Sequence, residues 1–268
     1  MAFYRDDDPA TFCPTIWVMD LLRDGAVLRF TDTGVAEPDF TPVWSPDGTE
    51  ILFSRGDDRG MRLLRQAQSG GPAMCVLNTP GPKFPTDWSS DRQLISYSSQ
   101  VPDYRYLHTW IVPITALSQG EKPRLFLQHS CSETSAYFAP AERGEAPRWI
   151  AYASDETGRD EVYVRDFPGA GHKWQVSNRG GLMPHWRRDG RELFYLTPDG
   201  TLMAVGVNAG GTFEVGDPQV LFATGLRLMP RYKSWMNQYA VSRDAQRFLL
   251  NRPVPETTSN AITAVVPW

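Results

Sequence analysis

Histidine and cysteine side chains are the residues of this chain most suited to binding a metal ion. The histidines are isolated in sequence, and none forms an H-x-H or H-x-x-x-H pair that would bring two imidazoles to one metal. The cysteines lie far apart and form no C-x-x-C motif, so we predict buried free thiols rather than a zinc site or a disulfide framework. These residues are His108, His129, His172, His185, Cys13, Cys75 and Cys131.

Acidic residues are concentrated in the stretch DETGRDE, residues 155–161. The pairs Asp155-Glu156 and Asp160-Glu161 could take part in acid–base chemistry or bind calcium. The stretch lacks the alternating carboxylates of a calcium-binding loop, however, and mixed-charge loops are usually solvated. We therefore predict no metal site here.

Motifs for nucleophilic and phosphate chemistry are missing from the sequence. It contains no G-x-S-x-G nucleophile elbow and no G-x-x-x-x-G-K-[ST] phosphate loop. The stretch GAGHKW, residues 169–174, follows no strand-to-helix pattern, so we expect no phosphate site there. A peptidase of the prolyl oligopeptidase type would need a further domain. The sequence thus predicts no catalytic residue and no cofactor.

The composition is that of a globular protein built from strands. Hydrophobic residues make up 41% of the 268 residues, and a net charge of -4 disfavours binding to nucleic acid. With 22 glycines and 22 prolines, short strands with frequent turns fit better than long helices. We see no basic start followed by an apolar run, and no apolar stretch of about 18 residues. We therefore expect no export signal and no membrane insertion by this chain.

A hairpin-like stretch recurs along the chain. Its best-preserved copy is PVWSPDGTEILFS, residues 42–54, in which two apolar runs flank a turn. Weaker copies lie at residues 85–98, 135–154, 183–196 and 237–251. A third strand-like segment follows each copy, for example EVYVRD at 161–166, and several have a shorter fourth one, for example KWQVS at 173–177. A period of about 40 to 50 residues with four short strands is typical of propeller blades.

The repeat predicts an all-β fold, in which residues 1–268 form a single six-bladed β-propeller domain. The first unit lacks its innermost strand and the last unit lacks its fourth, so we expect both end blades to be incomplete. Because one terminus of a propeller commonly completes the blade of the other, we hypothesise that sequence upstream of Met1 supplies both strands. The predicted blade units are residues 1–34, 35–80, 81–130, 131–178, 179–225 and 226–268.

The hairpin turn has a physical explanation. In the copy at residues 45–48, proline and aspartate occupy the central turn positions, and Gly48 can adopt the left-handed conformation that lets the strands twist together. The glycine is kept as Gly190 but is replaced by Arg92 and Ala245. These two residues would cost about 1 kcal/mol each if the turn requires a left-handed residue.

The stretches ASDETGRDEVYV, residues 153–164, and WRRDGRELFYL, residues 186–196, are the most specific to one family. Together with the repeat, they resemble the TolB-like, WD-type propeller at the C-terminus of many bacterial membrane-bound serine/threonine protein kinases. The resemblance covers nearly the whole chain. It implies a sensing or protein-binding module, periplasmic or otherwise extracytoplasmic when fused to a membrane kinase. The chain has no kinase motif of its own, so kinase activity is not implied.

An enzyme centred on the propeller channel would need several histidines or carboxylates on the innermost strands. His185 lies next to Trp186 on one such strand, and the matching positions of other copies hold Val43, Asp87 and Tyr137. One histidine and one carboxylate are too few for a metal site. We keep such an enzyme as the alternative function: a lyase, a glycoside-acting hydrolase or the propeller part of a prolyl oligopeptidase-type peptidase.

The loops that precede the innermost strands, and those between the second and third strands, gather on one face of a propeller. Here they carry tyrosine, tryptophan and arginine, which dominate protein interfaces. We therefore predict a protein or peptide ligand, bound without catalysis. The candidate ligand-binding residues are Arg55, Asp57, Arg59, Tyr104, Arg105, Tyr106, Asp155, Glu156, Arg159, Tyr232, Lys233 and Trp235.

Overall fold

The computed structural model divides the chain into two compact units, residues 1–128 and 129–268. Apart from the short helix α1 (Ala116–Gln119), the described elements are β-strands, which confirms the all-β prediction. No helix in the described part of the chain is long and apolar enough to cross a lipid bilayer. The structure describes residues 1–6, 13–21, 25–31, 37–57, 60–100, 105–127, 130–142, 144–169, 171–209, 212–226, 228, 237–252 and 263–265.

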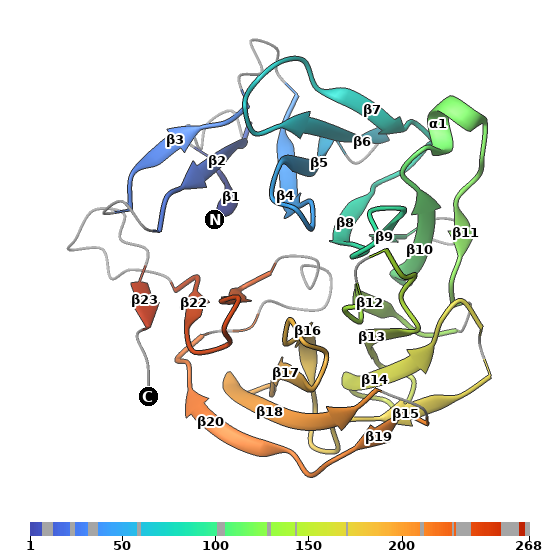
Figure 1. The fold of residues 1–268 in the computed structure, drawn as a ribbon, viewed down its shortest axis with the longest axis vertical. Coiled ribbons are helices and arrows are strands. Elements are labelled where there is room, and N and C mark those ends of the chain that lie inside the picture. The colour runs from blue at the N-terminus through green and yellow to red at the C-terminus, as the bar shows by residue number, and fades with distance from the viewer. Residues whose placement is uncertain are drawn as a thin grey trace. The chain divides into compact units, whose positions relative to one another are not determined.

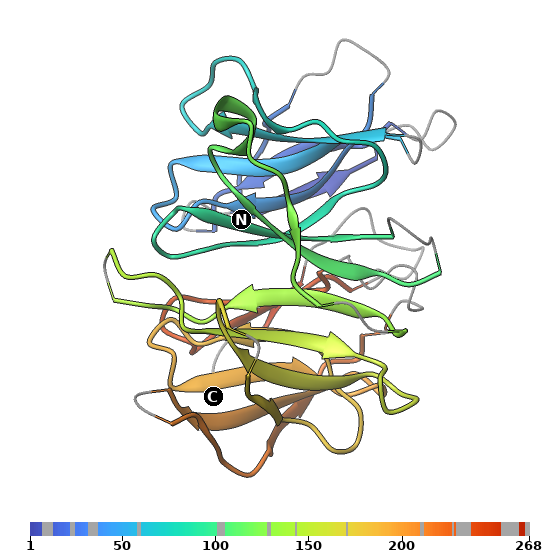
Figure 2. The same ribbon diagram turned by 90° about the vertical axis from the view of Figure 1, so that its right-hand side faces the viewer.

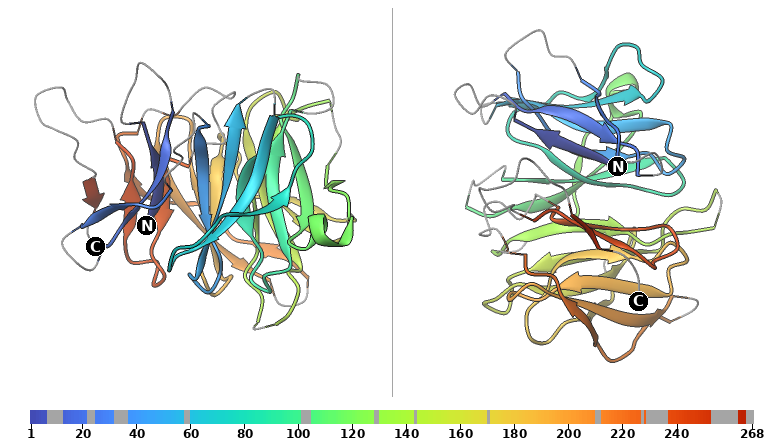
Figure 3. Two further views of the ribbon diagram at one scale, coloured as in Figure 1. Left: turned by 90° about the horizontal axis from the view of Figure 1, so that it is seen from above. Right: turned by 90° about the vertical axis from the view of Figure 1, so that its left-hand side faces the viewer.

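In its described residues, unit 1 contains three antiparallel sheets, each with its strands side by side in chain order (Figure 1). The first sheet consists of β1 (Ala2–Arg5), β2 (Thr15–Met19) and β3 (Val27–Arg29). The second consists of β4 (Asp39–Trp44), β5 (Glu50–Asp57), β6 (Gly60–Ala67) and β7 (Met74–Leu77). The third consists of β8 (Phe84–Trp88), β9 (Leu94–Ser99), β10 (His108–Pro113) and β11 (Arg124–Leu125). The second and third sheets, drawn in light blue to green, pack against each other in Figure 3.

Unit 2 also contains three antiparallel sheets in its described residues. The first consists of β12 (Glu133–Phe138), β13 (Trp149–Ser154), β14 (Glu161–Asp166) and β15 (Lys173–Gln175). The second consists of β16 (Leu182–Trp186), β17 (Glu192–Leu196) and β18 (Thr201–Asn208), with β19 (Glu214–Val215) and β20 (Gln219–Ala223) both paired to β18. The third consists of β21 (Tyr239–Val241), β22 (Phe248–Leu250) and β23 (Thr263–Val265). Figure 2 shows the first of these sheets, in yellow-green, stacked on the second, in orange.

Matching hydrogen bonds identify the equivalent strands of different sheets. The N–H of Val162 on β14 donates to Ser177 Oγ, and the N–H of Ile16 on β2 donates to Thr31 Oγ1 in the same way. Therefore β2 is a third strand, as β14 is, and β1 is a second strand. Within the described residues, the sheet of β1 to β3 and that of β21 to β23 have three strands each, as predicted for the two end units.

Three innermost strands contain a β-bulge with a residue in the left-handed conformation. These residues are Thr41 (φ 48°), Ser135 (φ 52°) and Met183 (φ 52°). A bulge re-aims the side chains that follow it. The strand registers pair Val43 with Leu52, Asp87 with Ser96, Tyr137 with Ala151, and His185 with Phe194, so the equivalence of these four positions is confirmed.

The hairpin turns behave as the sequence predicts. Gly48 (φ 74°), Arg92 (φ 65°), Gly190 (φ 70°) and Ala245 (φ 57°) are all left-handed, although only two of them are glycines. In the first of these turns, Ser45 Oγ donates to Asp47 Oδ1, which also accepts the N–H of the residue after the glycine. The same serine-to-aspartate bond recurs in the turns that contain Arg92 and Ala245. The side chains of each turn therefore hold the backbone in this conformation.

The hydrophobic core of each unit lies between neighbouring sheets. In unit 1, Leu52 and Leu63 of the second sheet pack with Trp88 and Ile95 of the third. In unit 2, the core between the first two sheets contains three aromatic side chains, Trp149, Tyr195 and Phe213. Burial of such side chains is the main favourable term in folding, and it fixes the strands whose ends carry the loops.

Candidate functional site

The predicted ligand-binding residues are distributed over both units. In unit 1, Arg55 and Asp57 lie on β5, and Arg105 and Tyr106 lie just before β10. In unit 2, the turn between β13 and β14 brings Asp155, Glu156 and Arg159 together. The other predicted residues, Arg59, Tyr104, Tyr232, Lys233 and Trp235, lie outside the described residues.

Arg55 neutralises a buried carboxylate. Its Nε donates to Asp39 Oδ1 at 2.7 Å and its Nη2 donates to Asp39 Oδ2 at 2.9 Å, while the Asp39 side chain is fully buried. The hydrogen bonds that Arg55 donates to this carboxylate raise the pKa of Arg55 above its usual value. Because a buried charge needs a partner, we infer that Arg55 has a structural role in unit 1.

The residues before β10 carry one exposed charge and one aromatic ring. Arg105 is exposed, and the ring of Tyr106 meets the ring of His108 edge-on, with 6.3 Å between the centroids. His108 is 3% exposed. Tyr106 therefore packs in part against a buried histidine.

The carboxylate of Glu161 is buried and accepts several hydrogen bonds. Glu161 begins β14, its side chain is fully buried, and both of its oxygens accept the backbone N–H of Gly180 at 3.1 Å. Oε2 also accepts the hydroxyl of Ser177, and Oε1 accepts Nε of Arg159 at 2.6 Å. These hydrogen bonds offset the cost of burying the carboxylate.

Gly180 is required where its backbone meets Glu161. Its φ is +91°, and a Cβ there would lie 2.5 Å from Cγ of Pro198. Only glycine tolerates both conditions, so the loop before β16 can bring this N–H to the carboxylate.

Arg159 is held in place and yet exposed. Besides the bond from its Nε to Glu161, its Nη2 donates to the carbonyl of Asn178 at 2.6 Å. The side chain is 60% exposed, and Nη1 makes no hydrogen bond within the described residues. Two bonds thus orient the guanidinium, while one nitrogen stays available to a ligand.

An open depression lies beside this guanidinium. Its volume is about 370 Å³, within the range of small-ligand sites. The Nε2 of Gln175 donates to the carbonyl of Ser177 at 2.7 Å, which fixes the amide of Gln175 at the edge. We call this feature the Glu161 depression, and its lining residues are Thr157, Gly158, Arg159, Glu161 and Gln175.

The other two predicted residues of this turn have local partners. Asp155 Oδ1 accepts the N–H of Ser132 at 2.8 Å, which ties the turn to the loop before β12. Glu156 forms an ion pair with Lys173, whose Nζ also lies 5.0 Å from the ring centroid of Tyr163. Of the three residues that the sequence predicted here, Arg159 is therefore the one whose Nη1 we consider as a donor to a ligand.

Sequence reasoning missed Thr157 and Gln175 as lining residues. Gln175 lies on β15, and the pairing of β15 with β14, Gln175 opposite Tyr163, brings it to the depression. The sequence contains no local signal for this proximity. It did single out Glu161, as part of an acidic pair, but set it aside as solvated.

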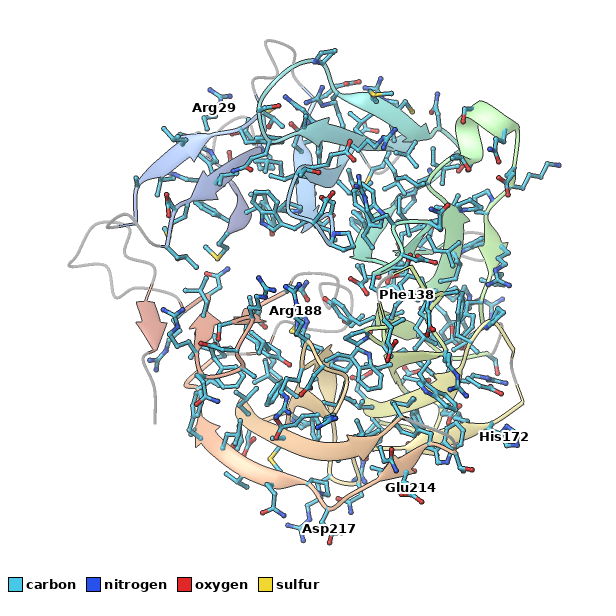
Figure 4. All side chains as sticks on the ribbon, in the orientation of Figure 1. Arg29, Phe138, His172, Arg188, Glu214 and Asp217 are labelled. Carbon is cyan, nitrogen blue, oxygen red and sulfur yellow. The ribbon has the colours of Figure 1, made fainter. Side chains whose placement is uncertain are left out.

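His172 and His185, the histidines of unit 2 that the structure describes, lie in different surroundings. The ring of His185 lies between those of Tyr137 and Tyr239, at centroid distances of 4.4 and 4.7 Å. Burial lowers the pKa of His185 to about 4, so the ring is neutral at pH 7. His172 is far more exposed, and its ring lies beside Asp166 and Trp174 at the end of the β14–β15 hairpin (Figure 4).

The described part of the chain contains no group of three or more His, Cys, Asp or Glu side chains placed to hold a metal ion. Its cysteines are free thiols, of which Cys131 is buried while Cys13 and Cys75 are partly buried. Burial raises the pKa of Cys131 to about 11, which disfavours the reactive thiolate.

Unit 1 contains a buried positive charge, opposite in sign to Glu161, that the sequence did not predict. Lys83, in the loop before β8, is 1% exposed, and its Nζ donates to the carbonyls of Met61 and Gly81, both at 2.9 Å, and of Thr79. A fourth carbonyl, of Pro80, lies at 3.4 Å. Burial lowers the pKa of Lys83 to about 8. The carbonyls satisfy the three donors of an ammonium group without a carboxylate.

Comparison with known proteins relates this structure to one architecture. No family model matches the chain, and no curated protein matches it. The structure is similar to TolB from Acinetobacter baumannii, with a TM-score of 0.67 and 16% sequence identity over 92% of this chain. The chain has the β-propeller fold. It spans 57% of the length of that TolB.

Other propellers are similar at lower scores. An oligogalacturonate lyase in complex with manganese has a TM-score of 0.58 and 15% identity, over 88% of this chain and 67% of the lyase. A chain of the nidogen/laminin complex has a TM-score of 0.53 and 10% identity, over 76% of this chain and 74% of that one. At these identities the likeness shows a shared fold, and function has to be argued from the site.

Proposed function

We propose that this propeller is a non-catalytic module that binds a protein or peptide ligand, with its six sheets acting as the blades of one TolB-like propeller. The observation that carries the proposal is the oriented, exposed guanidinium of Arg159 at the Glu161 depression. Arginine is among the residues that contribute most to protein interfaces. Because Arg159 is already ordered, binding costs less side-chain entropy than it would at a free arginine.

The surroundings of the depression favour binding over chemistry. Both oxygens of Glu161 already accept two hydrogen bonds each, so the carboxylate is engaged in holding Arg159, Ser177 and Gly180. The other lining groups are an amide, a hydroxyl and a glycine. These groups can form hydrogen bonds to a ligand but contain no nucleophile activated by a base.

A sensory role like that of the propellers of bacterial membrane-bound serine/threonine kinases rests on the sequence resemblance alone. The alternative, a channel-centred lyase, glycoside-acting hydrolase or peptidase propeller, would place function on the innermost strands, near Asp87 and His185. Metal analysis of the purified protein separates the two. Stoichiometric metal that is lost on Asp87→Ala or His185→Ala would support the enzyme and count against the binding module.

The proposal is tested by selecting peptides from a display library on the whole immobilised chain. We expect selected peptides to bind the wild type, and Arg159→Gln to weaken them by about tenfold or more. Arg191→Gln is the matched control, because Arg191 is an exposed arginine in the turn between β16 and β17. Failure to select any peptide, or equal loss in both variants, would contradict the proposal.

A further inference from the structure

The Glu161 depression has a specific chemical preference, and this inference rests on the function proposed above. We infer that it binds a carboxylate group of the peptide ligand through Nη1 of Arg159. The group would belong to an acidic side chain or to a C-terminus, since both present the same oxygens.

The first argument is the charge of the lining. Arg159 is the cationic residue among the five that line the depression, and Glu161 is the anionic one. Glu161 also accepts hydrogen bonds from Gly180 N–H and Ser177 O–H. The Arg159–Glu161 pair has no net charge, and the N–H groups on Nη1 of Arg159 are the charge-assisted donors that the lining offers to a ligand.

The second argument is geometry. Nε and Nη2 of Arg159 are bonded within the protein, so the planar guanidinium cannot rotate freely, and Nη1 keeps a fixed direction. A hydrogen bond from a guanidinium to a carboxylate is about twice as strong as one between neutral groups. A neutral carbonyl or hydroxyl at the same place would gain less.

The third argument is that neutral groups beside Arg159 can accept a hydrogen bond from a peptide backbone. The amide of Gln175 uses Nε2 to bind the Ser177 carbonyl, which leaves its Oε1 at the edge of the depression without a hydrogen bond in the described residues. This oxygen can accept the N–H of a peptide bond next to the bound carboxylate. Gly158 has open space where a Cβ would stand, so the ligand meets no side chain there. The depression therefore suits an acid attached to a peptide better than a free inorganic anion.

The test uses the full chain and two probes of nearly equal shape, titrated by NMR: N-acetyl-L-glutamate, which presents both a side-chain and a terminal carboxylate, and the α-amide of N-acetyl-L-glutamine, which presents none. We expect saturable shifts of the Arg159 side-chain resonance and of the Gly158 and Gln175 amides with the glutamate probe. The glutamine probe should bind about tenfold more weakly, and added salt should weaken the glutamate probe. Arg159→Gln should abolish the difference between the probes, while Arg191→Gln should preserve it.

Equal affinity for the two probes, or shifts that do not involve residues 157–161 and 175, would overturn the inference. A thermal melt of each variant shows that it is folded, and Arg159→Lys, which keeps the charge but loses the fork, should retain part of the preference. If selected peptides bind but the glutamate probe does not, the carboxylate inference fails and the proposed function stands. If the glutamate probe binds but no peptide is selected, the site stands and the proposed function fails.

Discussion

Lys83 in unit 1 and Glu161 in unit 2 are buried charges of opposite sign that the chain accommodates in different ways. Lys83 donates only to backbone carbonyls in its described contacts, and it is 1% exposed. Glu161 accepts backbone and hydroxyl donors, but it also binds Arg159, whose side chain is 60% exposed. The first arrangement is closed to solvent, whereas the second extends to the surface.

The two buried charges differ in the hydrogen-bonding capacity that they leave for a ligand. The carbonyls around Lys83 belong to β6 and to the loop before β8, so the ammonium joins two neighbouring sheets of unit 1. It has no hydrogen-bonding capacity left for a ligand, because three donors meet at least three acceptors. Arg159 retains such capacity at a depression. This difference supports the proposal that the Glu161 depression binds the ligand, whereas Lys83 has a structural role.

Removing the Lys83 ammonium gives the largest expected effect. In Lys83→Met the carbonyls of Met61, Gly81 and Thr79 lose a buried donor, and we expect the free energy of unfolding to fall by about 3 kcal/mol or more. Urea unfolding measures the change. The control is Lys122→Met, at an exposed lysine of the same unit, which should change stability by less than about 0.5 kcal/mol. Equal effects of the two variants would contradict a structural role for Lys83.

The burial of Lys83 also predicts a pH dependence of stability. The pKa of Lys83 is about 8 in the folded chain and 10.5 when unperturbed, so between these pH values the folded state binds fewer protons than the unfolded state. The contribution of Lys83 to stability should therefore rise as the pH is raised from 8 to 10.5. Unfolding of the wild type and of Lys83→Met at a series of pH values measures it. A constant difference between the two proteins would show that the pKa is not lowered.

Neutralising Glu161 has a smaller expected effect on stability. Glu161→Gln keeps the shape of the side chain but loses the charge-assisted bonds, and we expect a loss of about 2 kcal/mol in unfolding free energy. It should also release Arg159 and weaken selected peptides, because the guanidinium is no longer oriented. Glu142→Gln, at an exposed glutamate of unit 2, should change neither property. Full peptide affinity in Glu161→Gln would contradict the claim that Glu161 orients the Arg159 guanidinium for binding.

The smallest expected effect is at a hairpin turn, away from both charges. Ala245 has φ 57°, so Ala245→Gly should relieve left-handed strain and stabilise the protein by up to about 1 kcal/mol, less the entropy cost of glycine. Ala223→Gly on strand β20 should instead be destabilising. Thermal unfolding of both variants measures the contrast. Destabilisation by Ala245→Gly would show that the turn tolerates alanine without strain.

The repeat made the strands predictable, because paired apolar runs and the turn residues between them are local signals. The copies of PVWSPDGTEILFS located hairpins in both units, and they explain why Arg92 and Ala245 are left-handed. The candidate site was only partly predictable. Arg159 was identified by its residue type and its loop, but Gln175 reaches the depression only through strand pairing. Lys83 escaped notice because its partners are backbone carbonyls, which leave no pattern in the sequence.

Hydrogen exchange of the whole chain, with and without a selected peptide, tests the assignment of function most directly. We predict that the peptide slows exchange at residues 157–161 and 173–176, on both sides of the Glu161 depression, and leaves residues 79–84 around Lys83 unchanged. Slower exchange at 79–84, with none at the depression, would contradict the account.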